Sequence, residues 1–120
     1  MSSFNKAKMV SYKSLADLSA KQFYAVKLTA DNSVNLAGAV EGHGILMNTP
    51  ILNENAEVAV NGGGAKVKLG VGGCSFGQSL KVDAFGTLIV ASVGERALCI
   101  AEMAGIAGDV VAVLVGLHQA

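Results

Sequence analysis

Hydrophobic positions recur along most of this chain with the period of two that is typical of β-strands. Residues 55–60 place Ala56, Val58 and Val60 on one face, and residues 65–69 alternate in the same way. Short runs of this kind are separated by glycine, asparagine and aspartate, as in a β-sandwich or barrel. The predicted strands are 22–29, 34–37, 44–48, 55–60, 65–69, 80–83, 87–91, 97–103 and 110–115.

Turn residues indicate how these strands connect. Ala30-Asp31-Asn32-Ser33 and Asp83-Ala84-Phe85-Gly86 each predict a turn between two strands of a hairpin. The last run, residues 110–115, is apolar on both faces, so it is expected to be central or covered by a neighbouring subunit. We therefore take Val111, Val113 and Val115 as the candidate oligomer interface.

The first twenty residues show neither sustained helical nor strand periodicity. A short helical turn is conceivable at residues 14–17, where a serine precedes an acid by three positions. The sequence thus predicts an all-β fold, a compact small β-sandwich or barrel with an extended N-terminal arm. Its expected organisation is an arm over residues 1–20 and one β-domain over residues 21–120.

Two stretches of the chain resemble each other. The first stretch runs from residues 44–46 through an acidic turn to residues 56–60. The second runs in the same order from residues 99–101 through Gly108-Asp109 to residues 110–115. This pattern fits either two similar β-units or two hairpins that obey one rule. The second is the simpler interpretation.

Composition indicates a folded, assembling chain. Its 120 residues are 52% hydrophobic but only 5% aromatic, with a mean hydropathy of +0.49, which excludes a disordered protein. A domain of this size has much surface for its core, so we expect part of this aliphatic content to be buried against other subunits. No apolar run approaches the roughly 20 residues that span a membrane, and the lysine-bearing start is unlike a secretory signal. Synthesis in the cytoplasm is expected.

Charge is uneven although the net charge is zero. Residues 1–30 hold five lysines against Asp17 alone, and the remainder holds four basic and eight acidic residues. With one arginine in the chain, specific nucleic-acid recognition is not expected. A partner-docking arm and a disordered tail are both compatible with the basic segment. The candidate arm contacts are Phe4, Lys6, Lys8, Met9, Tyr12 and Lys13.

Each candidate for chemistry lacks an essential group. Gly72, Gly77 and Ser79 have the spacing of a phosphate loop, but Gln78 replaces its lysine. His43 and Glu41 share a strand face without a third ligand, so a turn histidine is the better interpretation. Cys74 and Cys99 lack metal-type spacing and are expected to be buried free thiols. Lys66 resembles the tip lysine of a carrier domain only in outline. We expect no enzyme, cofactor or metal.

Several segments resemble the small capsid decoration (cement) proteins of tailed bacteriophages. The matching stretches are residues 14–28, 34–39, 44–50, 56–60 and 107–115, and Gln78 departs from an acidic residue that is usual in that family. The resemblance implies a structural protein that binds the major capsid protein on the outside of the virion head, commonly as a homotrimer, without a membrane partner. A ligand-binding or carrier module, or a phage tail or spike component, is the alternative.

Overall fold

The structure, a computed structural model, describes residues 9–39, 41–60 and 63–120 and contains ten β-strands in this part of the chain. Five of them form a closed barrel in the order β1-β3-β2-β4-β5. These strands are β1 (Met9–Ser14), β2 (Ala25–Ala30), β3 (Ser33–Leu36), β4 (Gly44–Leu46) and β5 (Asn55–Ala59). We call residues 9–59 the barrel unit.

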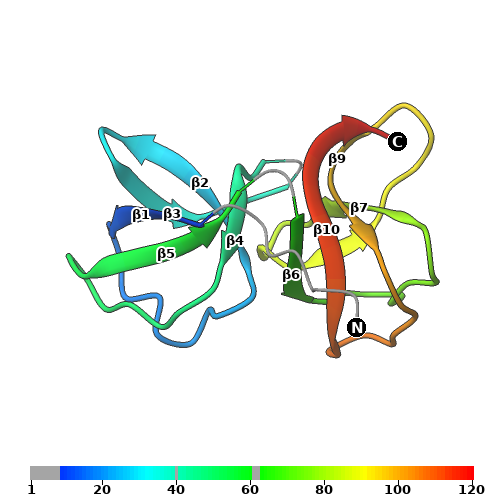
Figure 1. Ribbon diagram of the computed structural model, residues 1–120, viewed down its shortest axis with the longest axis horizontal. Coiled ribbons are helices and arrows are strands. Elements are labelled where there is room, and N and C mark those ends of the chain that lie inside the picture. The colour runs from blue at the N-terminus through cyan, green and yellow to red at the C-terminus, as the bar shows by residue number, and fades with distance from the viewer. Residues whose placement is uncertain (1–8, 40, 61–62) are drawn as a thin grey trace.

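The other five strands form a sheet in the order β6-β10-β9-β7-β8. They are β6 (Gly63–Lys68), β7 (Ser79–Val82), β8 (Leu88–Val90), β9 (Arg96–Ala101) and β10 (Val110–Gln119). We call residues 63–119 the sheet unit, and Figure 1 shows it beside the barrel unit. The all-β prediction is confirmed, and the final strand is central as expected. Among the described residues, no helix is long and apolar enough to cross a membrane.

The two units repeat one topology. In the barrel unit β1 pairs with β3 in parallel, and β3-β2, β2-β4, β4-β5 and β5-β1 are antiparallel. In the sheet unit the corresponding antiparallel pairs are β8-β7, β7-β9, β9-β10 and β10-β6, and one parallel bridge joins Leu69 to Leu88. The barrel and the sheet therefore have the same strand connections.

The repeat extends to single residues, at a spacing of 54 or 55 positions. Ile45 pairs with Ala59 in the barrel unit, and Ile100 pairs with Leu114 in the sheet unit. Phe23 and Gly77 both have a positive φ, 72° and 83°, so the same turn occurs in both units. Only the sheet unit has glycine, the residue that adopts a positive φ most easily, at this position. The simpler interpretation, two hairpins that obey one rule, is wrong, because the chain holds two similar β-units.

An ion pair also occurs twice. Lys27 Nζ lies 2.9 Å from Glu41 Oε1, and Lys81 Nζ lies 2.7 Å from Glu95 Oε2. Each carboxylate also accepts a backbone N–H three residues earlier, from Gly38 and Ser92. The pKa of each glutamate is held below its usual value, mainly by the hydrogen bond from the lysine and to a smaller extent by the backbone N–H.

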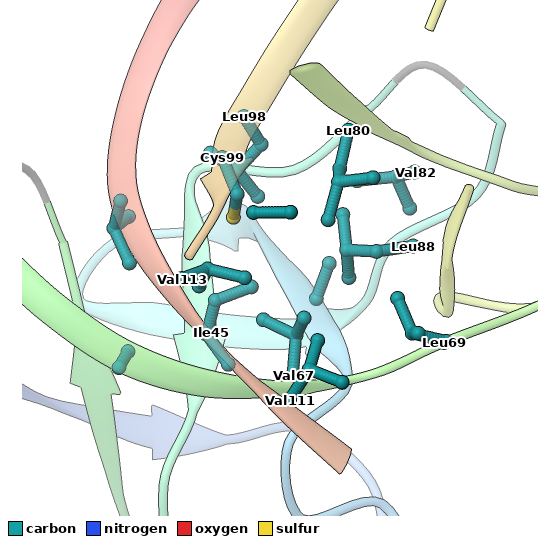
Figure 2. Packing of buried hydrophobic residues seen from close by; sticks show 14 of the residues in the cluster. Ile45, Val67, Leu69, Leu80, Val82, Leu88, Leu98, Cys99, Val111 and Val113 are labelled. Atoms are coloured by element: carbon teal, nitrogen blue, oxygen red, sulfur yellow. The ribbon is translucent and has the colours of Figure 1, made fainter. Parts of the chain in front are cut away.

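The core joins the two units. Inside the barrel, Val26, Leu46 and Val58 pack with Leu18. Residues on the opposite faces of β2, β4 and β5, namely Ala25, Ile45 and Ala59, belong instead to the core of the sheet unit. Figure 2 shows Ile45 beside Val67, Val111 and Val113 of that unit. The core of the sheet unit is therefore shared with one face of the barrel unit, beside a second core inside the barrel.

Backbone hydrogen bonds reinforce this junction. Lys68 N donates to Phe23 O at 2.9 Å, and Ala25 N donates to Gly86 O at 2.8 Å. Arg96 reaches across to the carbonyl of Gly42. Lys13 is the residue of the barrel unit that is equivalent to Lys68. Its backbone N–H donates to Asn32 O inside the barrel unit, so there the barrel is closed. The sheet unit is thus opened at the point where the barrel unit enters it.

The first strand corrects the expected arm. β1 pairs with β5 over five residues and with β3 over two, and Leu18 is buried with the barrel core. Residues 9–20 therefore belong to the folded body, and residues 14–17 form no helix. The sequence does not predict β1 because its ends reverse the usual pattern: the apolar Met9 is exposed and the polar Ser14 is buried. The rest of the predicted arm, residues 1–8, lies outside the described residues.

We predict that Ile45→Ala destabilises the whole protein by about 2–5 kcal/mol, because it leaves a cavity where the two units meet. Ile45 is fully buried, whereas Ile51 is 51% exposed, so Ile51→Ala is expected to cost within about 0.5 kcal/mol. Chemical denaturation followed by circular dichroism measures both. A cost for Ile45→Ala no greater than that for Ile51→Ala would contradict the shared core.

We also predict that Lys81→Met lowers stability at about pH 7 but not at about pH 2. Because its pKa is lowered, the Glu95 carboxylate stabilises the fold at neutral pH, and this contribution is lost as the pH falls through the lowered pKa. Thermal melting across this pH range is the measurement. Lys13→Met is the control, because Lys13 is exposed and has no ion pair among the described residues. Equal effects of Lys81→Met at both pH values would contradict the assignment.

Candidate interaction surfaces

The pair His43 and Glu41 is engaged in structural contacts. His43 Nδ1 accepts the backbone N–H of Leu28 at 3.0 Å, and Glu41 is bound by Lys27. Among the described residues, no cluster of three histidine, cysteine or acidic side chains is placed to hold a metal. His43 thus closes the loop before β4 onto β2.

A serine–histidine contact was not foreseen from the sequence. Ser79 Oγ lies 2.9 Å from His118 Nε2, and His118 Nδ1 lies 2.7 Å from the carbonyl oxygen of Gly116. If Nδ1 donates to that carbonyl, Nε2 accepts the serine hydroxyl proton. A catalytic triad has a carboxylate that orients the imidazole. Among the described residues, no carboxylate is hydrogen-bonded to His118. The contact instead ties the irregular end of β10, where His118 lies, to β7.

The remaining chemical candidates also have structural positions. Cys74 and Cys99 are free and buried, as predicted, and burial raises the pKa of both thiols. The glycine-rich segment 70–77 leads into β7 and not into a helix, so it lacks the helix N-terminus of a phosphate loop. Lys66 lies in the middle of β6, opposite Ala112, whereas a carrier lysine needs a turn.

The candidate arm contacts divide into two groups. Phe4, Lys6 and Lys8 lie outside the described residues. Met9, Tyr12 and Lys13 lie in β1, where Met9 is 41% exposed, Lys13 is exposed, and Tyr12 packs against the barrel core. Tyr12 is therefore a core residue of the barrel, and only Met9 and Lys13 of this group are available to a partner.

The three residues of the candidate oligomer interface face inward on the last strand, so they are not available to a second copy. Val111, Val113 and Val115 are 1%, 0% and 4% exposed and form part of the sheet unit's own core. The alternate residues face outward, with Val110 43% and Leu114 45% exposed. Alternation showed that both faces of β10 are apolar, but nothing in the sequence indicated which of them the chain covers itself.

The outer face of the sheet unit is apolar at its centre. Leu114 lies between Gly64 of β6 and Ile100 of β9, and Ser79 of β7 continues the row. Ile100 is 37% exposed. Cross-strand neighbours on one face of a sheet point to the same side, so these residues form one surface. We call it the β10 face.

A groove borders the β10 face. It has a volume of about 500 Å³ and lies between β6 and the barrel unit. Gly64 belongs both to the groove and to the row that contains Leu114. The residues that line the groove are Met9, Gln22, Phe23, Met47, Asn48, Glu57, Gly64, Ala65 and Lys66. The groove and the β10 face are therefore continuous.

Exposed isoleucines occupy equivalent loops of both units. Ile51 precedes β5 and is 51% exposed, and Ile106 precedes β10 and is 73% exposed. Each donates its backbone N–H to an acid three residues later, Glu54 at 2.9 Å and Asp109 at 3.0 Å. These bonds hold both loops in the same form while the isoleucine side chains stay in solvent. We call Ile51 and Ile106 the loop isoleucines.

In the sheet unit a second loop supports Ile106. Cys74 and Gly105 exchange two backbone hydrogen bonds, and a side chain at Gly73 would lie 2.3 Å from the carbonyl oxygen of Gly105. Val71, in the same loop as Gly73, is 86% exposed. Only glycine permits this close crossing, which holds the two loops together. No signal in the sequence marks the loop isoleucines, because their exposure depends on how the loops pack.

Comparison with known proteins establishes the fold. No family model matches the sequence, and no curated protein matches it. The structure is similar to the crystal structure of the head fiber gp8.5 N base in bacteriophage phi29, with a TM-score of 0.68 and 15% sequence identity. The likeness covers 91% of this chain and 95% of that one, so both units take part in it. The chain thus has, nearly from end to end, a fold that also occurs in the base of a phage head fiber.

Proposed function

We propose that this protein is a capsid decoration protein that binds the outer surface of a phage head and stabilises contacts between major capsid subunits. The likeness to a phage head fiber base, over 91% of the chain, is the observation that carries the proposal. The expectation of a cement protein from the sequence concerns the same part of a virion, although no family model matches the sequence. The function requires binding surfaces only, without a cofactor or a catalytic group.

The loop isoleucines are the proposed contacts with the capsid. Ile51 and Ile106 occupy equivalent exposed positions, although the two units differ at most other positions. An exposed isoleucine gives the fold little stability, whereas its burial in a partner is worth roughly 1.5–3 kcal/mol. Two such contacts in one chain, multiplied by oligomerisation, permit firm binding from weak individual contacts.

Self-association is the second part of the proposal, and a homotrimer is the expected form. A decoration protein gains avidity when several linked copies bind neighbouring capsid subunits together. Exposed apolar residues are concentrated in the sheet unit, which supports a contact between copies in addition to the contact with the capsid.

We predict that the wild-type protein binds purified phage heads that lack it, and that Ile51→Asp with Ile106→Asp weakens this binding about tenfold or more. The reason is that the substitutions place carboxylates where apolar side chains would be buried. Co-sedimentation with heads measures the affinity. Val93→Asp is the matched control, because Val93 is 98% exposed in the loop before β9. In Figure 1 this loop lies at the opposite end of the sheet unit from the loop before β10, which contains Ile106. Failure of the wild type to bind heads would overturn the function, and normal binding by the double variant would overturn the assigned contacts.

The arm has a test of its own. Deleting residues 2–8 is expected to weaken head binding and to leave the melting temperature unchanged, because it leaves all the described strands of the barrel unit in place. Deletion through residue 20 is expected to unfold the barrel, since it removes β1 and the buried Leu18. Normal head binding by the shorter deletion would show that the arm has no part in it.

A further inference from the structure

The β10 face carries opposite charges on its two sides. Lys66 of β6 lies directly opposite Ala112, and on the other side Glu102, immediately after β9, donates its backbone N–H to the Ala112 carbonyl at 3.0 Å. Both charged residues are exposed, and neither has an ion pair in the described part of the chain. A cationic side chain, Lys66, therefore lies on one side of Ala112, and an anionic side chain, Glu102, lies on the other.

The repeat within the chain indicates what covers such a face. Ile45 and Ala59 of the barrel unit are equivalent to Ile100 and Leu114 of the sheet unit, by the register of their strands. The first two are 0% and 1% exposed because the sheet unit packs on them, whereas the second two are 37% and 45% exposed. In this fold the outer face of β4 and β5 is therefore covered by another unit of the same fold, and the equivalent face of β9 and β10 is open.

We propose that a second copy of this chain covers the β10 face, with Lys66 of one copy facing Glu102 of the next. The inference rests on the self-association that the proposed function includes, and it assigns that association to named residues. The opposite charges on the two sides of the face favour it, because one subunit's cationic side then meets its neighbour's anionic side. Such a head-to-tail contact uses two different patches and is the kind that closes into a ring.

The contact differs in detail from the one within the chain. The sheet unit is open where the barrel unit enters it, but the barrel unit is closed at the equivalent point by Lys13 N donating to Asn32 O. A second copy therefore packs across the β10 face and does not insert a strand. The adjoining groove beside Met9 and Met47 extends the surface available to it.

Charge reversal tests the contact in the isolated protein, without the capsid. Sedimentation velocity over a range of concentrations measures self-association of the wild type, Lys66→Glu, Glu102→Lys and the double variant. Each single reversal is expected to weaken self-association about tenfold or more, since it places like charges together, and the double variant is expected to restore it. Leu114→Lys should dissociate the oligomer, and Val93→Lys, at an exposed position off this face, should not. Circular dichroism confirms that each variant is folded.

The outcomes separate this inference from the function it rests on. A wild type that is monomeric at every concentration would overturn both self-association and the β10 face. An oligomeric wild type that is unaffected by Leu114→Lys and by both single reversals would overturn the face alone. Loss of head binding by Leu114→Lys in a protein that stays oligomeric would assign the face to the capsid instead.

Discussion

The packing of Ile45 into the core of the sheet unit is the contact on which the rest of the structure depends. Its neighbour Leu46 fills the barrel, so two successive residues of one short strand serve two different cores. Each unit by itself is small, and a small domain buries too little surface for independent stability. Sharing the larger core through Ile45 joins the two units and places their outer surfaces relative to each other.

The repeat separates the surface features that the fold itself requires from those that need another explanation. Where the units keep the same feature, such as the Lys27–Glu41 and Lys81–Glu95 pairs, the fold itself accounts for it. Exposed apolar residues need another reason. The loop isoleucines occur in both units without contributing to either core, and Leu114 stands in the sheet unit where the barrel unit has the small, covered Ala59. The two apolar surfaces are therefore the ones that we propose bind the capsid and a second copy.

Nine of the ten strands follow from alternation and turn residues, because a period of two and clusters such as Asp83-Ala84-Phe85-Gly86 are local properties. β1 does not follow from the pattern, because its apolar Met9 faces solvent while its polar Ser14 is buried. The interface assignment failed for a different reason. Val113 and Leu114 are equally apolar, and only the tertiary packing decides which of them the chain buries. Exposure of Ile51 and Ile106 likewise depends on long-range contacts.

Cryo-electron microscopy of heads that carry the protein tests the central claim most directly, namely that distinct apolar surfaces bind the capsid and a second copy. The account predicts density for the chain on the outer shell, with Ile51 and Ile106 against the major capsid protein and with Leu114 and Ile100 against a neighbouring copy. Density showing these residues exposed to solvent in the assembled head, or no density for the chain on the shell, would contradict it.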